Sequence, residues 1–384
     1  MKFKTSFINL IIIISSVYLP MLVLSSYSIL FGKSSKIVDK RLINEDLPQK
    51  LNALEKGFLP VYSPESVKEY AKETKIFPIG SLPYTSSYIC NEGYGLILYK
   101  TDRFGLRNID TNWNQIQHKS NIFVIGDSFV HGACVPEKYT ITEKLKEITN
   151  LNAINLGTSA NGPYEYQALL KNLVSPILSE LDKNNKVILI FFGNDDIKSD
   201  KRLNKLISNS QPIVKFNLEG DALPTEQYRN TIIKLIKLNF PTAASDISKI
   251  LREDKKELFE MKSIRILTLE PIRHRLGFIT SFFSRTDTQY SSPSHDSIKM
   301  LANICVAKCT PYTVYIPASS FWNLGAIKYK KSIKKLSKLH GISFIDGEDV
   351  IDPNNKEDYA PKGSHLSITG YKKLAELIKL SIIN

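Results

Sequence analysis

A short apolar run that leads directly into a turn of small residues is the strongest fold signal in this chain. Residues 122–125 are Ile, Phe, Val and Ile, and Gly126, Asp127 and Ser128 follow them. The run predicts a buried strand, and a glycine-containing turn between a strand and a helix can hold a hydroxyl outside the carboxyl end of a parallel sheet. Ser128 is therefore a candidate nucleophile, although Gly, Asp and Ser are also the commonest residues of ordinary turns.

Predicted strands and helices alternate from residue 121 to the end of the chain. Beyond the first strand, strands are expected at residues 152–156, 187–192, 313–317 and 342–345. Helices are expected at residues 140–149, 164–181, 327–340 and 369–382. Such alternation indicates an α/β fold with a parallel sheet and helices on both of its faces. We expect this domain to span residues 121–384, with a largely helical insertion at about residues 198–300, where the alternation stops.

The first 120 residues divide into an expected anchor and a connecting region. Residues 7–31 carry no charge and are rich in Ile, Leu and Val. A helix of this length can cross a bilayer. We expect residues 1–32 to be a retained, single-pass anchor in the lipid bilayer, because no A-x-A-like cleavage site follows. Basic residues flank the run on both sides, so its orientation stays open. Residues 33–120 are expected to connect the anchor to the domain and to pack against the domain.

The charge and composition exclude some classes of protein. With 42% hydrophobic and 23% charged residues, the chain is neither disordered nor wholly membrane-embedded. The net charge of +13 is carried by lysines that are spread along the sequence, and no nucleic-acid motif accompanies them. We interpret the charge as solvated basic surface, including one face of a helix at residues 328–338, and expect no nucleic-acid partner.

The four cysteines are Cys90, Cys134, Cys305 and Cys309. They are too few for a disulfide framework, so free buried thiols are expected, although a Cys90–Cys134 bridge is possible in an oxidising compartment. Cys305 and Cys309 are four residues apart on an expected helix, with no second Cys/His pair to complete a zinc site. No metal and no cofactor are expected.

Four residues follow predicted strands in a way that suits acyl transfer. Ser128, Gly157 and Asn194 each stand just past a strand, and His365 lies on the loop after the last one. In a doubly wound sheet, sites form outside the carboxyl ends of the strands. Ser128 would attack an ester carbonyl, His365 would act as general base, and the N–H groups of Ser128 and Gly157 with the amide of Asn194 would stabilise the oxyanion. Each residue alone also suits a turn, a helix cap or a surface position.

Four short motifs resemble the SGNH (GDSL) hydrolase family. They are GDSF at 126–129, NLG at 155–157, GND at 193–195 and HLSITGY at 365–371, which look like blocks I, II, III and V in that order. The resemblance covers residues 121–197 and about 310–384. It implies a three-layer α/β/α fold resembling flavodoxin, with about five parallel strands. It also implies Ser128 as nucleophile, His365 as base, and Gly157 and Asn194 as oxyanion donors.

A finer resemblance concerns residues 102–113 and the following GDSFVHGACV. Both look like membrane-anchored SGNH proteins of bacterial surface-polysaccharide modification. This implies a serine esterase or O-acyltransferase that acts on an acylated carbohydrate through an acyl-enzyme. We expect the catalytic domain outside the cytoplasm, although the flanking charges leave the orientation open. Whether water or a sugar hydroxyl takes the acyl group stays open, as does the oligomeric state. The alternative is a catalytically silent SGNH fold that binds polysaccharide or scaffolds its assembly.

One position departs from the family pattern. Family members usually have an aspartate three residues before the histidine, and here that residue is Lys362. Asp358 is a possible orienting acid, and a backbone carbonyl is the other candidate acceptor for the Nδ1–H of His365. In either case His365 Nε2 is predicted to lie within hydrogen-bonding reach of Ser128 Oγ, or one water away. A His365 that faces solvent would instead favour the silent fold.

Overall fold

The computed structural model describes residues 47–61, 76–77, 80–181, 184–193, 211–212, 230, 233, 293–319 and 326–383. The chain divides into two compact units, residues 1–51 with 241–287 and residues 52–240 with 288–384. Almost all described residues belong to the second unit. The expected anchor and most of the expected insertion lie outside the described residues. Within the described ranges, no helix is long and apolar enough to cross a membrane.

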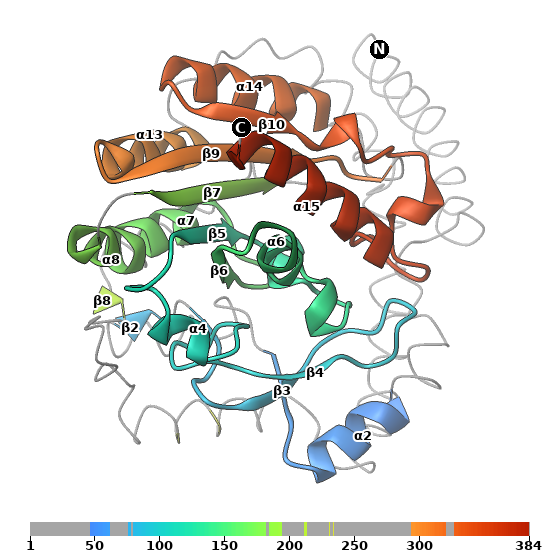
Figure 1. Ribbon diagram of the computed structural model, residues 1–384. Helices are drawn as coiled ribbons and strands as arrows, with labels where there is room; N and C mark the ends of the chain where they lie inside the picture. The colour runs from blue at the N-terminus through green and yellow to red at the C-terminus, as the bar shows by residue number, and fades with distance from the viewer. Residues whose placement is uncertain are drawn as a thin grey trace, which may run out of the picture. The chain divides into compact units, whose positions relative to one another are not determined.

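A five-stranded parallel sheet forms the centre of the second unit (Figure 1). The spatial order of its strands is β10-β9-β7-β5-β6. Numbered by their order in the chain, this is the 2-1-3-4-5 arrangement of flavodoxin-like folds, and the order reverses between β5 and β7. The expected α/β fold with five parallel strands is confirmed. The strands are β5 (Asn121–Gly126), β6 (Asn152–Gly157), β7 (Asn185–Phe192), β9 (Cys309–Ile316) and β10 (Ser343–Asp346).

Helices cover both faces of this sheet, so the unit has three layers. On one face lie α7 (Pro163–Leu169), a π-helical turn (Leu170–Val174), α8 (Ser175–Glu180), α13 (Pro293–Cys305) and α14 (Ala326–Leu339). On the other lie α5 (Ser128–His131), α6 (Ile141–Thr149) and α15 (Ile368–Ile383). Phe123 and Ile125 of β5 point into the first layer, and Ile122 and Val124 point into the second. All four are fully buried, which explains why this strand reads as a continuous apolar run.

The expected insertion ends earlier than the sequence pattern indicates. That pattern places residues 293–300 in the insertion, but they form the first part of α13. Ile298 and Leu301 of this helix are fully buried in the same cluster as the side chains of β7. The helix therefore belongs to the layer that covers the sheet.

A small second sheet precedes β5 in the chain. It has the order β1 (Leu59–Pro60), β3 (Ser86–Tyr88) and β4 (Leu98–Lys100), with α2 (Leu47–Glu55) before it. A separate pair joins β2 (Ile76–Phe77) to β8 (Gln211–Pro212). After β4, Asn108 covers the edge strand β6: its Nδ2 donates to Asn155 O (2.9 Å), and its Oδ1 accepts from Asn155 N (2.7 Å). The connecting region thus completes the edge of the large sheet.

A buried carboxylate organises this connecting segment. Asp102 accepts hydrogen bonds from the N–H groups of Phe104 and Leu106, both at 2.8 Å. It also accepts from Asn108 Nδ2 at 2.8 Å and from the indole of Trp113, in α4 (Thr111–Asn114), at 2.7 Å. Burial raises the pKa of Asp102 to about 6, and the four donors act in the opposite direction. A single side chain therefore shapes the turn from β4 to α4.

The expectation of free cysteine thiols is wrong. Cys90 pairs with Cys134, and Cys305 pairs with Cys309. The second pair does not lie on one helix, because α13 ends at Cys305 and β9 begins at Cys309. The chain turns between them and brings their Cα atoms to 4.5 Å, which is within the range for a disulfide.

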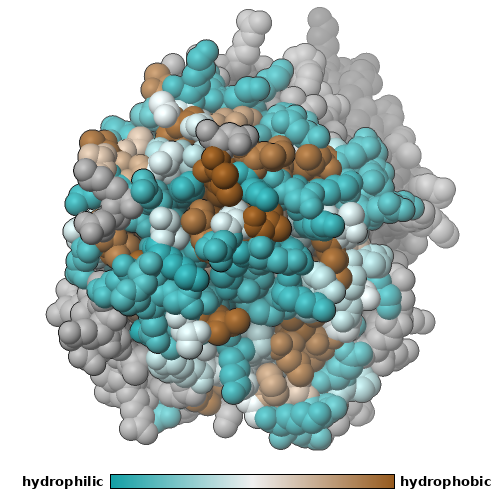
Figure 2. Space-filling view, in the orientation of Figure 1, coloured by the Kyte–Doolittle hydropathy of each residue, from teal (hydrophilic) through white to brown (hydrophobic). Residues whose placement is uncertain are grey.

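The described residues on the face shown in Figure 2 form a mixed surface rather than a continuously apolar one. In the face shown in Figure 2, hydrophilic residues predominate and hydrophobic residues form separate groups. On α14, Ile333 and Leu336 are buried, and the exposed residues include Lys331, Lys334 and Lys338. This is the solvated basic helix face that the sequence predicts.

Gly105 gives a test of the connecting segment. Its φ is +74°, and a Cβ there would lie 1.8 Å from Ser81 O. We expect Gly105→Ala to lower the free energy of unfolding by more than about 3 kcal/mol, because the backbone of residue 81 cannot move away cheaply. Gly341→Ala is the control, since Gly341 also has a positive φ of +67° but a Cβ there would meet no atom within 4 Å. It should cost about 1–2 kcal/mol. Equal losses in urea unfolding would contradict the role of Gly105.

Candidate active site

Ser128 lies at the first residue of α5, immediately past the carboxyl end of β5. The turn between them needs Gly126, because a Cβ there would lie 2.4 Å from Val130 Cγ2. Asp127 caps the helix: its Oδ1 accepts from the N–H of Phe129 at 2.9 Å. Burial raises the pKa of Asp127 to about 6. The small-residue turn thus places the hydroxyl at the edge of the sheet where the strand order reverses.

Ser128 and His365 are in direct contact. The distance from His365 Nε2 to Ser128 Oγ is 2.9 Å, which is the geometry that the sequence predicts. On the opposite side of the ring, His365 Nδ1 lies 2.8 Å from Glu92 Oε1. A carboxylate only accepts, so Nδ1 carries the proton and Nε2 is free to accept from the serine. Glu92 Oε2 also accepts from the backbone N–H of His365 at 3.1 Å.

His365 Nδ1 faces Glu92, and neither of the two expected acceptors, the Asp358 carboxylate or a backbone carbonyl, takes this place. The carboxylate of Asp358 is buried and binds Lys373 Nζ at 2.6 Å and the N–H of Asp352 at 3.0 Å. Its backbone carbonyl accepts from Ser367 N at 3.0 Å. Asp358 therefore stabilises the turn before α15, and the acid beside His365 is Glu92.

Sequence reasoning missed Glu92 because it lies 273 residues before His365, outside every motif. It belongs to the loop between β3 and β4. A signal was present in the possible Cys90–Cys134 bridge. A disulfide so close to the nucleophile also brings the sequence neighbours of Cys90 to the site, and Glu92 is the acid among them.

The loop that carries Glu92 fits against the loop that carries His365. Asn91 Oδ1 accepts from the N–H groups of Gly93 (2.9 Å) and Gly95 (3.0 Å), which shapes the turn. The N–H of Lys362 donates to Glu92 O at 2.9 Å. A Cβ on Gly363 would lie 1.8 Å from Glu92 Cδ. Lys362 therefore supplies a backbone contact, and the adjacent glycine leaves space for the carboxylate of Glu92.

The structure does not present Gly157 as a ready oxyanion donor in the way that the sequence predicts. The N–H of Gly157 donates to Asn155 Oδ1 at 2.9 Å, so it is already paired. A Cβ on Gly157 would lie 2.3 Å from the backbone nitrogen of His131, so this glycine allows β6 to contact α5. Its predicted role as an oxyanion donor would require the bond to Asn155 to break. Asn194 lies outside the described residues.

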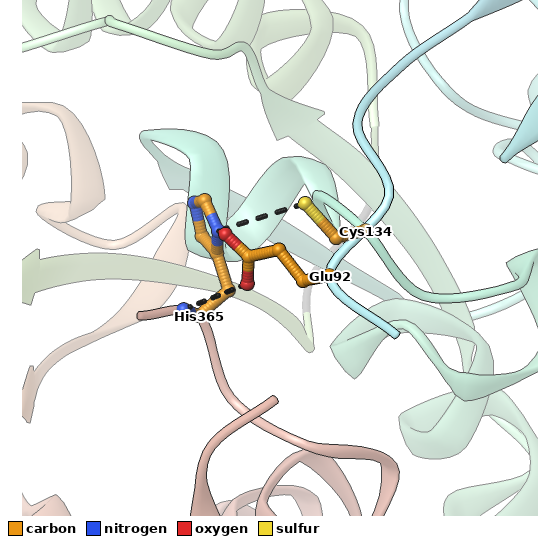
Figure 3. A group of neighbouring side chains, drawn as sticks. All are labelled: Glu92, Cys134 and His365. Atoms are coloured by element: carbon orange, nitrogen blue, oxygen red, sulfur yellow. Dashed lines mark hydrogen bonds and ion pairs between the residues drawn. The ribbon is translucent and has the colours of Figure 1, made fainter. Parts of the chain in front are cut away.

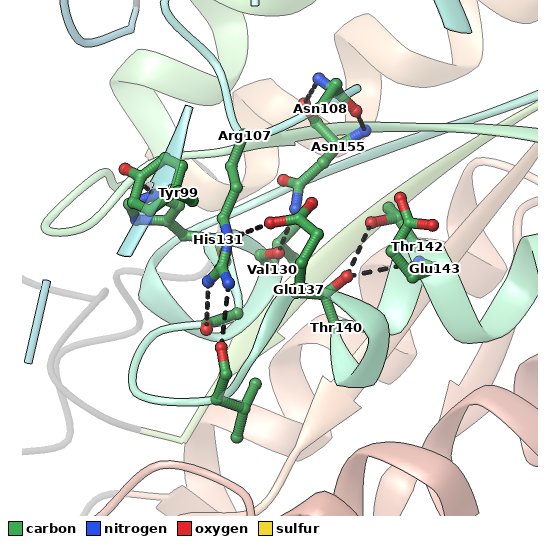
Figure 4. Close-up of polar contacts among 12 residues, drawn as sticks. Tyr99, Arg107, Asn108, Val130, His131, Glu137, Thr140, Thr142, Glu143 and Asn155 are labelled. Atoms are coloured by element: carbon green, nitrogen blue, oxygen red, sulfur yellow. Dashed lines mark hydrogen bonds and ion pairs between the residues drawn. The ribbon is translucent and has the colours of Figure 1, made fainter. Parts of the chain in front are cut away.

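A buried arginine holds the segment that follows Ser128 and α5 (Figure 4). Arg107 donates through Nη1 to Gly132 O (2.7 Å) and through Nη2 to Val135 O (2.9 Å). Its Nε binds Glu137 at 2.7 Å, and the Arg107 side chain is fully buried. The guanidinium also lies over the ring of Tyr99, 4.8 Å from its centroid. Arg107 thereby fixes the end of α5 and the turn around Cys134.

A histidine on α5 connects the same network to the loop after β6. His131 Nε2 lies 2.8 Å from the hydroxyl of Tyr99, and Nδ1 lies 2.9 Å from Ser159 Oγ. Burial, with Arg107 nearby, lowers the pKa of His131 to about 3. The ring is therefore neutral at physiological pH and acts as a hydrogen-bonding link, not as a charge.

Glu92, Cys134 and His365 also form the type of cluster that can bind a metal ion (Figure 3). One donor atom from each lies within 4.8 Å of the others. However, Cys134 Sγ is bonded to Cys90, and metal binding requires a thiolate. With the disulfide formed, Cys134 offers no thiolate ligand, and the cluster consists of the His365–Glu92 pair with the Cys134 sulfur beside it.

Comparison with family models finds no match, and no curated protein matches. Similar solved structures include a putative lipolytic protein of the G-D-S-L family from Desulfitobacterium hafniense, with 13% identity over 68% of this chain and 98% of that chain, TM-score 0.34. A carbohydrate acetylesterase from Sinorhizobium meliloti is 14% identical, and the match covers 69% of this chain and 100% of the acetylesterase, with a TM-score of 0.34. An aryl esterase from M. smegmatis is 11% identical, and the match covers 69% of this chain and 98% of the esterase, with a TM-score of 0.35. These values are too low to carry an argument about activity.

The fold and the site nevertheless define a class. A serine at the carboxyl edge of a parallel sheet contacts a histidine, and that histidine contacts a carboxylate. In this arrangement, which recurs on unrelated folds, a serine can act as nucleophile, the histidine as its general base and the carboxylate as the group that orients the base.

Replacing Glu92 tests this assignment. Glu92→Gln keeps the size of the side chain but removes the charge that holds the Nδ1–H tautomer, so turnover should fall about 10³–10⁴-fold. Asp358→Asn is the matched control, since it alters a buried carboxylate that does not contact His365. It should lower the melting temperature and leave kcat within about threefold of wild type. Steady-state hydrolysis of an aryl ester measures both, and a larger kcat loss in Asp358→Asn would refute the assignment.

Proposed function

We propose that this protein is a serine esterase or O-acyltransferase of the SGNH type that acts on an acylated carbohydrate. The observation that carries the proposal is the continuous path from Ser128 Oγ to His365 Nε2 (2.9 Å) and from Nδ1 to Glu92 Oε1 (2.8 Å). The alternative, a catalytically silent fold, loses support because such a protein does not require the three side chains to be aligned.

The geometry supports acylation of Ser128 in the first half-reaction. His365 Nε2 takes the hydroxyl proton as Ser128 Oγ attacks the ester carbonyl carbon, and Glu92 stabilises the imidazolium that forms. The N–H of Ser128 is at the first residue of α5, where helix N–H groups lack intrahelical partners, so it is available to the oxyanion. We propose the amide of Asn194 as a second donor. His365 then protonates the leaving alcohol, and an acyl-Ser128 ester remains.

The second half-reaction reverses these proton transfers. His365 Nε2 takes a proton from the acceptor hydroxyl while the acceptor oxygen attacks the acyl carbon, and Ser128 Oγ leaves and recovers a proton. Water as acceptor gives a free acid, whereas a sugar hydroxyl gives a new ester. The carbohydrate substrate rests on the resemblance of residues 102–113 to membrane-anchored SGNH proteins of surface-polysaccharide modification.

We further propose that the protein is anchored in a membrane with this unit outside the cytoplasm. The uncharged run at residues 7–31 supports the anchor. The two disulfides support an oxidising compartment, because disulfides are rare in the cytosol. The full-length protein should stay in the membrane pellet after carbonate extraction. A mature amino terminus at about residue 30 would show instead that the segment is a cleaved signal.

An active-site probe tests the nucleophile. A fluorophosphonate should label the wild-type protein at Ser128, and Ser128→Ala should lose both labelling and ester hydrolysis, because the attacking oxygen is absent. Asn194→Ala should retain labelling but lose about 10²–10³ in turnover. Mass spectrometry locates the label, and release of acyl groups from an O-acetylated polysaccharide measures turnover. Full hydrolysis by Ser128→Ala would exclude the proposed function.

A further inference from the structure

We propose that the Cys90–Cys134 disulfide positions Glu92 for catalysis, so that full turnover requires this bond to be oxidised. The inference rests on the proposed function, since it concerns the acid of the same site. It assigns a catalytic consequence to one disulfide of the two that the described residues contain.

The disulfide joins the two halves of the site. Cys90 is two residues before Glu92, and Cys134 is six residues after Ser128 and just past the end of α5. The bond therefore ties the β3–β4 loop directly to the turn that follows the nucleophile. Cys134 Sγ lies 3.7 Å from His365 Nδ1, so the sulfur is adjacent to the atom that Glu92 must reach (Figure 3).

Hydrogen bonds and the partly buried ring of Tyr94 hold the Glu92 loop against the rest of the site. None of residues 89–96 is fully buried, and Tyr94 packs against the apolar cluster of β5 and α15 while only partly buried, so the apolar anchoring of the loop is limited. Its contacts to the His365 loop include the bond from Lys362 N and the two bonds from His365 to Glu92. A partly exposed glutamate held in this way can exchange its hydrogen bonds for water. The covalent link keeps the effective concentration of the carboxylate at the ring high.

The anchor point of the disulfide is itself rigid. Cys134 is fully buried, and the carbonyls of Gly132 and Val135 on either side of it are held by the buried guanidinium of Arg107. The flexible side of the bond is therefore the Glu92 loop. Reduction should release that loop while the turn after α5 keeps its position.

Reduction is a balanced two-electron step. A dithiol reductant supplies two electrons and two protons to the sulfur–sulfur bond, Cys90 and Cys134 become thiols, and the reductant becomes a disulfide. Oxidation of the two thiols by a disulfide oxidant reverses the step. The state of one bond thus decides whether Glu92 is tethered.

The second disulfide provides a control within the same chain. Cys305 and Cys309 join the end of α13 to the start of β9, away from the loops that carry Glu92 and His365. Its removal tests loss of a disulfide without loss of the tether. A general loss of stability would lower the activity of both variants, whereas positioning would affect only the first.

The experiment measures ester hydrolysis by the full-length protein for Cys90→Ser and for Cys305→Ser/Cys309→Ser, below the melting temperature of each variant. Cys90→Ser should lower kcat about 10–100-fold with little change in KM, because a small displacement of a positioning group has effects of this size. Dithiol treatment of the wild type should cause the same loss, and reoxidation should restore kcat. The control variant should keep wild-type kcat.

Two further measurements separate positioning from a structural effect. In a Glu92→Gln background, Cys90→Ser should cause no additional loss of kcat, because the disulfide acts through Glu92. In proton NMR, a downfield His365 Nδ1–H resonance should be present in the wild type, absent in Glu92→Gln and weakened in Cys90→Ser. An unchanged kcat and resonance in Cys90→Ser, or equal losses in both backgrounds, would overturn the positioning role alone. Absence of Ser128-dependent hydrolysis in the wild type would overturn the proposed function and this inference together.

Discussion

The contact between Glu92 and His365 is the interaction on which the candidate site depends. It joins two loops that are 273 residues apart in the chain, and it determines which ring nitrogen of the histidine faces Ser128. The residues around His365 leave space for Glu92 and hydrogen-bond to its backbone. Gly363 leaves room for the carboxylate, and Lys362 donates its backbone N–H to the carbonyl oxygen of Glu92. The disulfide beside the ring adds a covalent link across the same boundary.

The buried polar network beneath α5 explains why the connecting region belongs to the same compact unit as the candidate site. A buried charge is costly unless it is paired, and Arg107 is paired with Glu137 and with backbone carbonyls near Cys134. Asp102 and Asn108 extend the network to the edge strand β6. These residues contact no reacting atom. They stabilise the position of the helix that begins with Ser128.

Periodicity predicted most elements of the sheet and its helices, and the differences have local physical reasons. The helix expected at residues 164–181 is interrupted by a π-helical turn at Leu170–Val174. Pro176 follows that turn and has no N–H, so the regular ladder of hydrogen bonds cannot continue through it. The strand expected at 187–192 begins at Asn185, whose side chain bonds to Asn121 of the neighbouring strand. Polar residues at strand ends are not distinguished from turns by an apolar pattern.

The sequence by itself determined the parallel α/β fold, the position of Ser128 and its pairing with His365, because each depends on local signals: apolar strands, a small-residue turn and a histidine before the last helix. Only the tertiary structure decided which acid completes the site and which cysteines pair. Asp358 is closer to His365 in sequence, but its carboxylate is used by Lys373 and by the backbone of Asp352. Glu92 comes from a distant loop that the folded chain brings beside the ring. Sequence distance does not predict such a contact, because it depends on how separate loops pack at one edge of the sheet.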